Sequence, residues 1–145
     1  MASDGIEPGA AAPAVPRPYA AHLLVVDDNL ELLSFLEMLL SSQYRVTALS
    51  SPLQAALLGQ TQRFDLLVSD IRMPQLSGTQ LFEALRGTHL NHDLPVVFIS
   101  GQVDFNQVDG DRAPTPYYLR KPFKGSDLTT AVEQQLRTRP PRHYG

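Results

Sequence analysis

The chain has 145 residues, 43% of them hydrophobic and 19% charged, which is typical of one globular domain with a full-sized core. The formal net charge is −3, and the lack of a basic block argues against direct binding of nucleic acid. There are no cysteines, which excludes disulfides, thiolate metal sites and cysteine nucleophiles. Neither a signal peptide nor an apolar stretch of membrane-spanning length is found, so we expect a cytoplasmic protein without membrane contact.

The two ends of the chain differ in composition from its middle. Residues 1–20 contain six Ala and four Pro and no repeating apolar face, which predicts a flexible tail. Residues 139–145 are expected to form a C-terminal tail or the start of a linker. Residues 21–138 then make up one domain.

Strand and helix patterns alternate five times between these tails. Strands are predicted over residues 23–26, 44–49, 64–69, 95–99 and 117–119, and helices over 29–41, 52–59, 78–86, 103–108 and 126–137. The fourth helix is weak, because its segment is rich in Asp, Asn and Gly, which are poor helix formers. Strands that are apolar throughout favour a parallel sheet covered on both faces. Right-handed crossovers then give a three-layer α/β sandwich.

Polar side chains follow the ends of four of these strands. Asp27 and Asp28 follow the first, Asp70 the third and Ser100 the fourth, while Lys121 lies two residues beyond the fifth. The carboxyl ends of strands in an open α/β sheet converge on the ligand crevice. Three carboxylates in one crevice repel each other, and a divalent cation relieves that repulsion. An all-oxygen acidic site suits Mg²⁺.

The same set of residues has the parts needed for phosphoryl transfer to an aspartate. That chemistry requires a carboxylate nucleophile, a magnesium ion and a cationic group. Lys121 can neutralise a phosphoryl oxygen, and Ser100 adds a hydroxyl donor. The four histidines, His22, His89, His92 and His143, show no metal-ligand spacing and are assigned to the surface.

With these residues at these positions, the chain resembles the receiver domain of two-component response regulators. The intervals also fit: Asp70 lies 42 positions after Asp28, Ser100 lies 30 positions after Asp70, and Lys121 lies 21 positions after Ser100. The resemblance covers roughly residues 21–138. It implies the flavodoxin-like receiver fold, with a five-stranded parallel sheet in the order 2-1-3-4-5.

The resemblance also implies a function and a metal site. Asp70 would accept a phosphoryl group from a sensor histidine kinase or a histidine phosphotransfer protein. Mg²⁺ would be held by Asp28, Asp70 and the backbone carbonyl of Arg72, with Asp27 acting through a metal-bound water. Such a domain catalyses only its own phosphorylation and dephosphorylation, is not a metabolic enzyme, and acts on a downstream protein or output domain that the sequence does not identify.

Other positions would control the phosphorylated state. Ser100 and Tyr118 correspond to the switch residues of the family, although an aromatic at a strand end can simply serve packing. Arg72 and Gln102 lie two residues after Asp70 and Ser100, and both can overhang the phosphate and hinder attack by water. We expect them to modulate the lifetime of the phosphorylated state.

The first predicted helix carries a candidate docking surface. Its core stripe is predicted to consist of Leu32, Phe35, Leu36, Leu39 and Leu40. Leu30 and Leu33 fall outside this stripe and are expected to be exposed beside the acids, where they would receive a helix of the kinase. Scattered surface leucines are the alternative.

Two other functions are compatible with this fold. A flavin-binding electron carrier would need backbone and hydroxyl donors after the first strand to hold a phosphate, and Asp27-Asp28 would repel that anion. A degenerate receiver that acts as a phosphorylation-independent interaction module is the other alternative.

Overall fold

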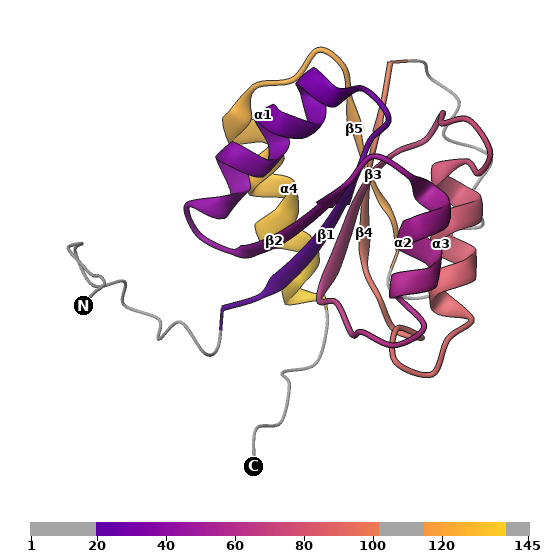
Figure 1. Ribbon diagram of the computed structural model, residues 1–145. Helices are drawn as coiled ribbons and strands as arrows, with labels where there is room; N and C mark the ends of the chain where they lie inside the picture. Colours follow the sequence, from indigo (N-terminus) through magenta and orange to yellow (C-terminus); the bar gives the residue numbers. More distant parts are fainter. Residues whose placement is uncertain (1–19, 102–114, 139–145) are drawn as a thin grey trace, which may run out of the picture.

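The structure, a computed structural model, describes residues 20–101 and 115–138. Its five parallel strands form one sheet in the order β2-β1-β3-β4-β5. The strands are β1 (His22–Val26), β2 (Arg45–Leu49), β3 (Leu66–Asp70), β4 (Val96–Ser100) and β5 (Tyr117–Arg120), and the helices are α1 (Leu30–Ser41), α2 (Pro52–Leu58), α3 (Gly78–Arg86) and α4 (Gly125–Arg137) (Figure 1). None of the helices in these ranges is long and apolar enough to cross a membrane.

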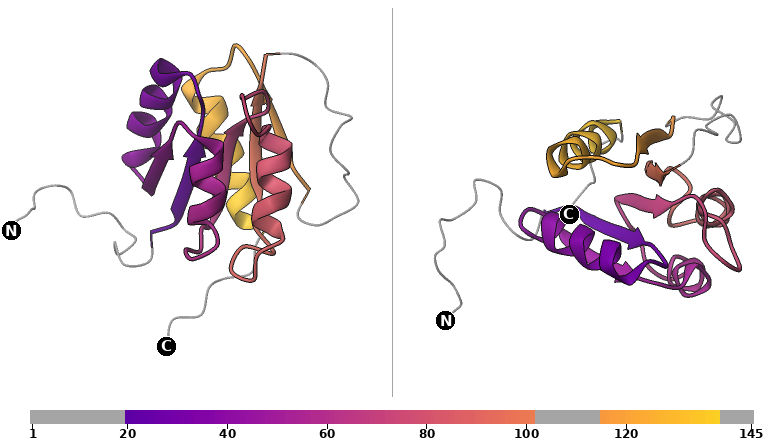
Figure 2. Two further views of the ribbon diagram at one scale, coloured as in Figure 1. Left: turned by 45° about the vertical axis from the view of Figure 1, so that its right-hand side comes forward. Right: turned by 90° about the horizontal axis from the view of Figure 1, so that it is seen from above.

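The helices cover both faces of the sheet. α1 and α4 pack on one face, and α2 and α3 on the other (Figures 1 and 2). Each face has its own core: Leu36 and Val132 belong to the cluster under α1 and α4, and Leu81 and Phe98 to the cluster under α2 and α3. The predicted three-layer sandwich and its strand order are therefore confirmed. The predicted tails and the weak fourth helix lie outside the described residues, apart from residue 20.

Three helices begin at side-chain caps that the sequence supplies. Asn29 caps α1 by accepting from the backbone N–H groups of Glu31 and Leu32. Ser51 caps α2, with Pro52 in the first turn, and Ser77 caps α3 in a reciprocal capping box with Gln80. The caps of α1 and α3 come shortly after the acids that end β1 and β3. They fix how the chain turns away from the crevice.

The structure corrects the predicted orientation of α1. Leu33 is only 8% exposed and packs in the core with Leu36 and Leu40, whereas Phe35 is 39% exposed. The prediction of an exposed Leu33 is wrong because α1 is apolar around most of its circumference. The other predicted members of the stripe do pack in or against this core, namely Leu32, Leu36, Leu39 and Leu40. Packing against the sheet buries Leu33 in place of Phe35.

The opposite end of the sheet, where the strands begin, is closed by buried polar side chains. The backbone N–H of His22 donates to Asp65 Oδ2 at 2.8 Å, and its ring contacts Thr47 Oγ1 at 2.7 Å and Phe64 edge-on. Because His22 is buried, its assignment to the surface is wrong; His89 and His92 are exposed. The buried amide of Gln135 in α4 donates to Val96 O and Thr115 O, both at 2.9 Å.

Candidate functional site

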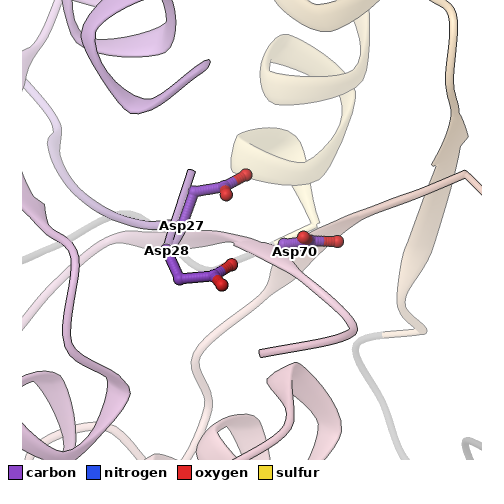
Figure 3. A group of neighbouring side chains, drawn as sticks. All are labelled: Asp27, Asp28 and Asp70. Carbon is purple, nitrogen blue, oxygen red and sulfur yellow. The ribbon is translucent and has the colours of Figure 1, made fainter. Parts of the chain in front are cut away.

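Three carboxylates meet at the carboxyl ends of β1 and β3. Asp27 and Asp28 directly follow β1, and Asp70 is the last residue of β3. Each contributes one oxygen to a group in which all three oxygens lie within 4.8 Å of one another. Figure 3 shows the side chains of Asp27 and Asp28 both extending toward the side on which Asp70 lies. The sheet order explains the meeting, since β1 and β3 are hydrogen-bonded neighbours.

Asp27 is the most buried of the three acids, with no exposed surface. Its Oδ1 accepts from the N–H of Asn29 at 2.8 Å, and this bond holds the cap of α1. Its Oδ2 is buried and has no hydrogen-bond partner. Burial raises the pKa of Asp27 to about 6; the bond from Asn29 opposes that rise, and the negative charge of Asp70 adds to it.

The pKa of Asp70 is shifted in both directions by its surroundings. Burial raises the pKa of its carboxyl group, while the ammonium of Lys121 and the backbone N–H groups of Arg72 and Ile71 lower it. Lys121 Nζ lies 3.7 Å from Asp70 Oδ2. The backbone of Lys121 is fixed beside β4, because its backbone N–H donates to the carbonyl oxygen of Ser100 at 2.9 Å. The site therefore combines three clustered carboxylates with one cation.

These residues fit a hard divalent cation. A buried carboxylate oxygen without a donor is costly, and Asp27 Oδ2 is such an atom. Lys121 offsets one of the three negative charges, so the described group of side chains keeps a net negative charge. An all-oxygen donor set of this kind suits Mg²⁺ better than softer metals.

The loop between β3 and α3, which directly follows Asp70, lines a cavity. This cavity of about 540 Å³ is lined by Ile71, Arg72, Met73, Pro74 and Ser77. Arg72 is exposed and is one of the residues that line this cavity. The other predicted lifetime modulator, Gln102, lies outside the described residues.

The two predicted switch residues lie on neighbouring strands. Ser100 is buried at the end of β4. Tyr118 in β5 is half-buried, and its ring stacks at a tilt on Phe98, with centroids 5.6 Å apart. The packing role of Tyr118 is thus present, and its switch role stays a prediction. Of the two docking candidates, Leu30 is 65% exposed at the start of α1, and Leu33 is in the core.

Sequence reasoning missed one polar residue at the site. Ser69 precedes Asp70 in β3 and is buried. Its hydroxyl donates to the backbone carbonyl of Asp70 at 2.8 Å. The available signal was a serine inside a strand that is otherwise apolar up to the aspartate.

Comparisons with known proteins agree with this geometry. A family model described as the response regulator receiver domain matches residues 23–133. The response regulator receiver protein CpdR of Brucella abortus is 34% identical over 116 residues, covering 79% of this chain and 94% of that protein. Other curated relatives are longer, and the chain spans 22%, 7% and 55% of three of them.

Solved structures show the same likeness. A response regulator receiver protein from Sinorhizobium medicae matches with a TM-score of 0.71 and 32% identity, over 81% of this chain and 95% of that one. The receiver domain of a sensor histidine kinase from Pseudomonas aeruginosa, solved with a magnesium ion coordinated in its active site cleft, matches with a TM-score of 0.68 and 28% identity, over 81% and 98%. The chain described here belongs to the receiver domains of two-component response regulators, a family that signals through phosphorylation.

Proposed function

We propose that Asp70 is the phospho-acceptor of this receiver domain and that its phosphorylation depends on Mg²⁺. The observation that carries this proposal is the cluster of Asp27, Asp28 and Asp70 within 4.8 Å, with Lys121 Nζ 3.7 Å from Asp70. The donor would be a phosphohistidine of a sensor histidine kinase or a phosphotransfer protein in the cytoplasm. The domain would catalyse only its own phosphorylation and dephosphorylation.

The residues divide the chemistry between them. A carboxylate oxygen of Asp70 attacks the phosphorus, a P–O bond forms, the P–N bond of the phosphohistidine breaks, and the imidazole leaves and takes up a proton. Lys121 then pairs with an oxygen of the transferred group. Asp28, Asp70 and the carbonyl of Arg72 would hold Mg²⁺, and Asp27 would accept from one of its waters. When bound, the ion neutralises charge on the carboxylates and the phosphoryl oxygens.

Phosphorylation would then change the surface that a downstream protein or output domain contacts. Ser100 ends β4 beside Lys121, which follows the neighbouring strand β5. Its hydroxyl would donate to the phosphate, and the side chain of Tyr118 would then turn inward. Leu30 remains as the exposed contact for the kinase. Arg72, over the cavity, and Gln102 would set the lifetime of the phosphate by hindering water.

Labelling with a small phosphodonor tests this function without knowledge of the kinase. The wild-type domain is incubated with acetyl phosphate, with Mg²⁺ or with EDTA, and the mass of the intact protein is measured. We expect a gain of one phosphoryl group only with Mg²⁺, and none in Asp70→Asn, because an amide is not a competent nucleophile.

A second aspartate serves as the matched control. Asp93→Asn, at the other end of the sheet in a loose ion pair with Arg63, should be labelled like the wild type. Labelling of Asp70→Asn at the wild-type rate would refute the site assignment. An unlabelled wild-type domain, also unaffected by beryllofluoride with Mg²⁺, would instead favour a phosphorylation-independent interaction module.

A further inference from the structure

The backbone carbonyl of Asp70 is held from two directions. Ser69 Oγ donates to it at 2.8 Å. Because side chains alternate along a strand, Ser69 shares the face of Leu67, which belongs to the core under α2 and α3. Ser69 is only 1% exposed, so water has little access to its hydroxyl. The hydrogen bond to Asp70 is therefore not easily replaced by a solvent contact.

Gly78, the first residue of α3, covers the same carbonyl. A Cβ atom added at Gly78 would lie 2.2 Å from Asp70 O and 3.0 Å from Ile71 Cα, so only glycine permits this approach. The N–H of Gly78 donates to Ile71 O at 2.7 Å, and the N–H of Ile71 donates to Ile99 O at 3.1 Å. The Asp70–Ile71 peptide is thus held by Ser69 and β4, and the carbonyl of Ile71 is held by the first residue of α3.

The orientation of this backbone bears directly on the acceptor carboxylate. The backbone N–H groups of Ile71 and Arg72 lower the pKa of the Asp70 carboxyl group, because their dipoles favour its charged form. They can act steadily on the carboxylate only if their own peptides are fixed. A rotation of the Asp70–Ile71 peptide would turn the Ile71 N–H away and shift the next residue, Arg72, with it.

We propose that Ser69 is a positioning residue for Asp70: its buried hydroxyl, together with the close packing of Gly78, fixes the Asp70–Ile71 peptide and so aims the carboxylate into the site. The role in phosphorylation rests on the proposed function of Asp70. The role in backbone order does not. Ser69 touches neither the donor nor the metal and acts only through the backbone.

Amide hydrogen exchange tests the backbone role without metal or phosphodonor. Ser69→Ala should speed exchange of the Ile71 and Gly78 amides, which donate to Ile99 O and Ile71 O, by about 3- to 10-fold relative to the Leu67 amide in β3, the range expected for loss of one hydrogen bond. Ser69→Thr keeps the hydroxyl and should restore the wild-type ratio. Thr47→Val removes a hydroxyl from β2, which β1 separates from β3, and should leave the ratio unchanged.

Phosphorylation kinetics test the functional role. At saturating acetyl phosphate and Mg²⁺, Ser69→Ala should lower the maximal rate by about 3- to 10-fold, with Ser69→Thr close to the wild type. Unchanged exchange and rate in Ser69→Ala, or equal losses in the Ala and Thr variants, would overturn the proposal, because the hydroxyl would then not matter. A wild-type domain that is never labelled would refute the function of Asp70, and the exchange ratios would still decide whether Ser69 orders the backbone.

Discussion

The two ends of the sheet bury polar side chains in opposite ways. Where the strands begin, Asn91 is fully buried and all its bonds are made: Nδ2 donates to Gly59 O and Gln62 O at 2.8 and 3.0 Å, and Oδ1 accepts from the N–H of Phe64 at 2.9 Å. Where the strands finish, Asp27 is also fully buried, yet its Oδ2 has no hydrogen-bond partner, and two more carboxylates lie beside it.

This difference separates residues that stabilise the fold from residues that prepare a site. Satisfied buried amides hold loops together. Clustered carboxylates cost free energy in the absence of a ligand, and they become favourable when a cation arrives. Substitutions where the strands begin should therefore reduce the stability of the fold and leave phosphorylation of Asp70 unchanged. Substitutions among the acids should reduce phosphorylation and leave the stability unchanged or raise it.

The largest stability effect is expected at Asn91. Asn91→Ala removes three hydrogen bonds and leaves buried backbone groups of Gly59, Gln62 and Phe64 without their partner. We expect the free energy of unfolding to fall by about 3 kcal/mol, as measured by urea denaturation. The fraction that remains folded should still be labelled on Asp70. A loss of labelling larger than the loss of folded protein would contradict the separation of the two ends.

In the metal-free protein, substitution of Asp27 should raise stability, whereas substitution of Asn91 lowers it. Burial raises the pKa of Asp27 from 3.8 to about 6, so the folded state binds this proton more tightly than the unfolded chain does. The free energy of unfolding should then fall by up to about 3 kcal/mol as the pH rises from about 4 to about 6. Above that pH it should stay at the lower value. Asp27→Asn should flatten this fall and stabilise the protein by about 1–3 kcal/mol at pH 7.5.

Urea denaturation between pH 4 and pH 7.5, in EDTA, measures this effect. Glu37→Gln is the matched control, since it removes one negative charge from the exposed surface of α1 and should change little. If the stability of the wild type and that of Asp27→Asn changed with pH in the same way between pH 4 and pH 6, Asp27 would carry no such cost.

The smallest effect is expected for binding of Mg²⁺ to Lys121→Ala. The lysine is the cation beside the acids, 3.7 Å from Asp70, so its removal leaves the carboxylates more negative. Mg²⁺ should bind as tightly as to the wild type or a few-fold more tightly, while the phosphorylated state loses the partner that its switch needs. Titration calorimetry measures the affinity, with the exposed Lys124→Ala as control. Abolished binding would mean that the lysine shapes the metal site itself.

Much of this architecture could be predicted from the sequence. The alternation of strands and helices predicted the layers, the resemblance to receiver domains implied the strand order, and the acids at the strand ends indicated where the crevice lies. Helix α2 begins and ends where Ser51-Pro52 and Gly59 indicate, and α3 spans the predicted residues. These features follow from local chemistry, namely caps, proline and apolar strands that end in polar residues.

The errors arose where tertiary packing decides between local alternatives. The exact rotation of α1 depends on how its side chains fit the sheet, and the sequence alone favours neither Leu33 nor Phe35 for the edge of the buried stripe. His22 looked like a surface residue because its partners, Thr47, Gln62 and Asp65, are distant in sequence. The contact between Ser69 and the Asp70 carbonyl depends on how the backbone turns after β3, which spacing cannot reveal.

Gln135 has a consequence for how this domain tolerates sequence change. Its amide in α4 binds the backbone carbonyls of Val96 and Thr115, which every amino acid possesses. Substitutions at positions 96 and 115 therefore leave both acceptors in place. At position 135 the tie depends on one chemical group, because glutamate would present an anion to two carbonyl oxygens and alanine would supply no donor. The hydrogen bonds between α4 and the strands therefore survive substitution of either acceptor residue, but they do not survive substitution of Gln135.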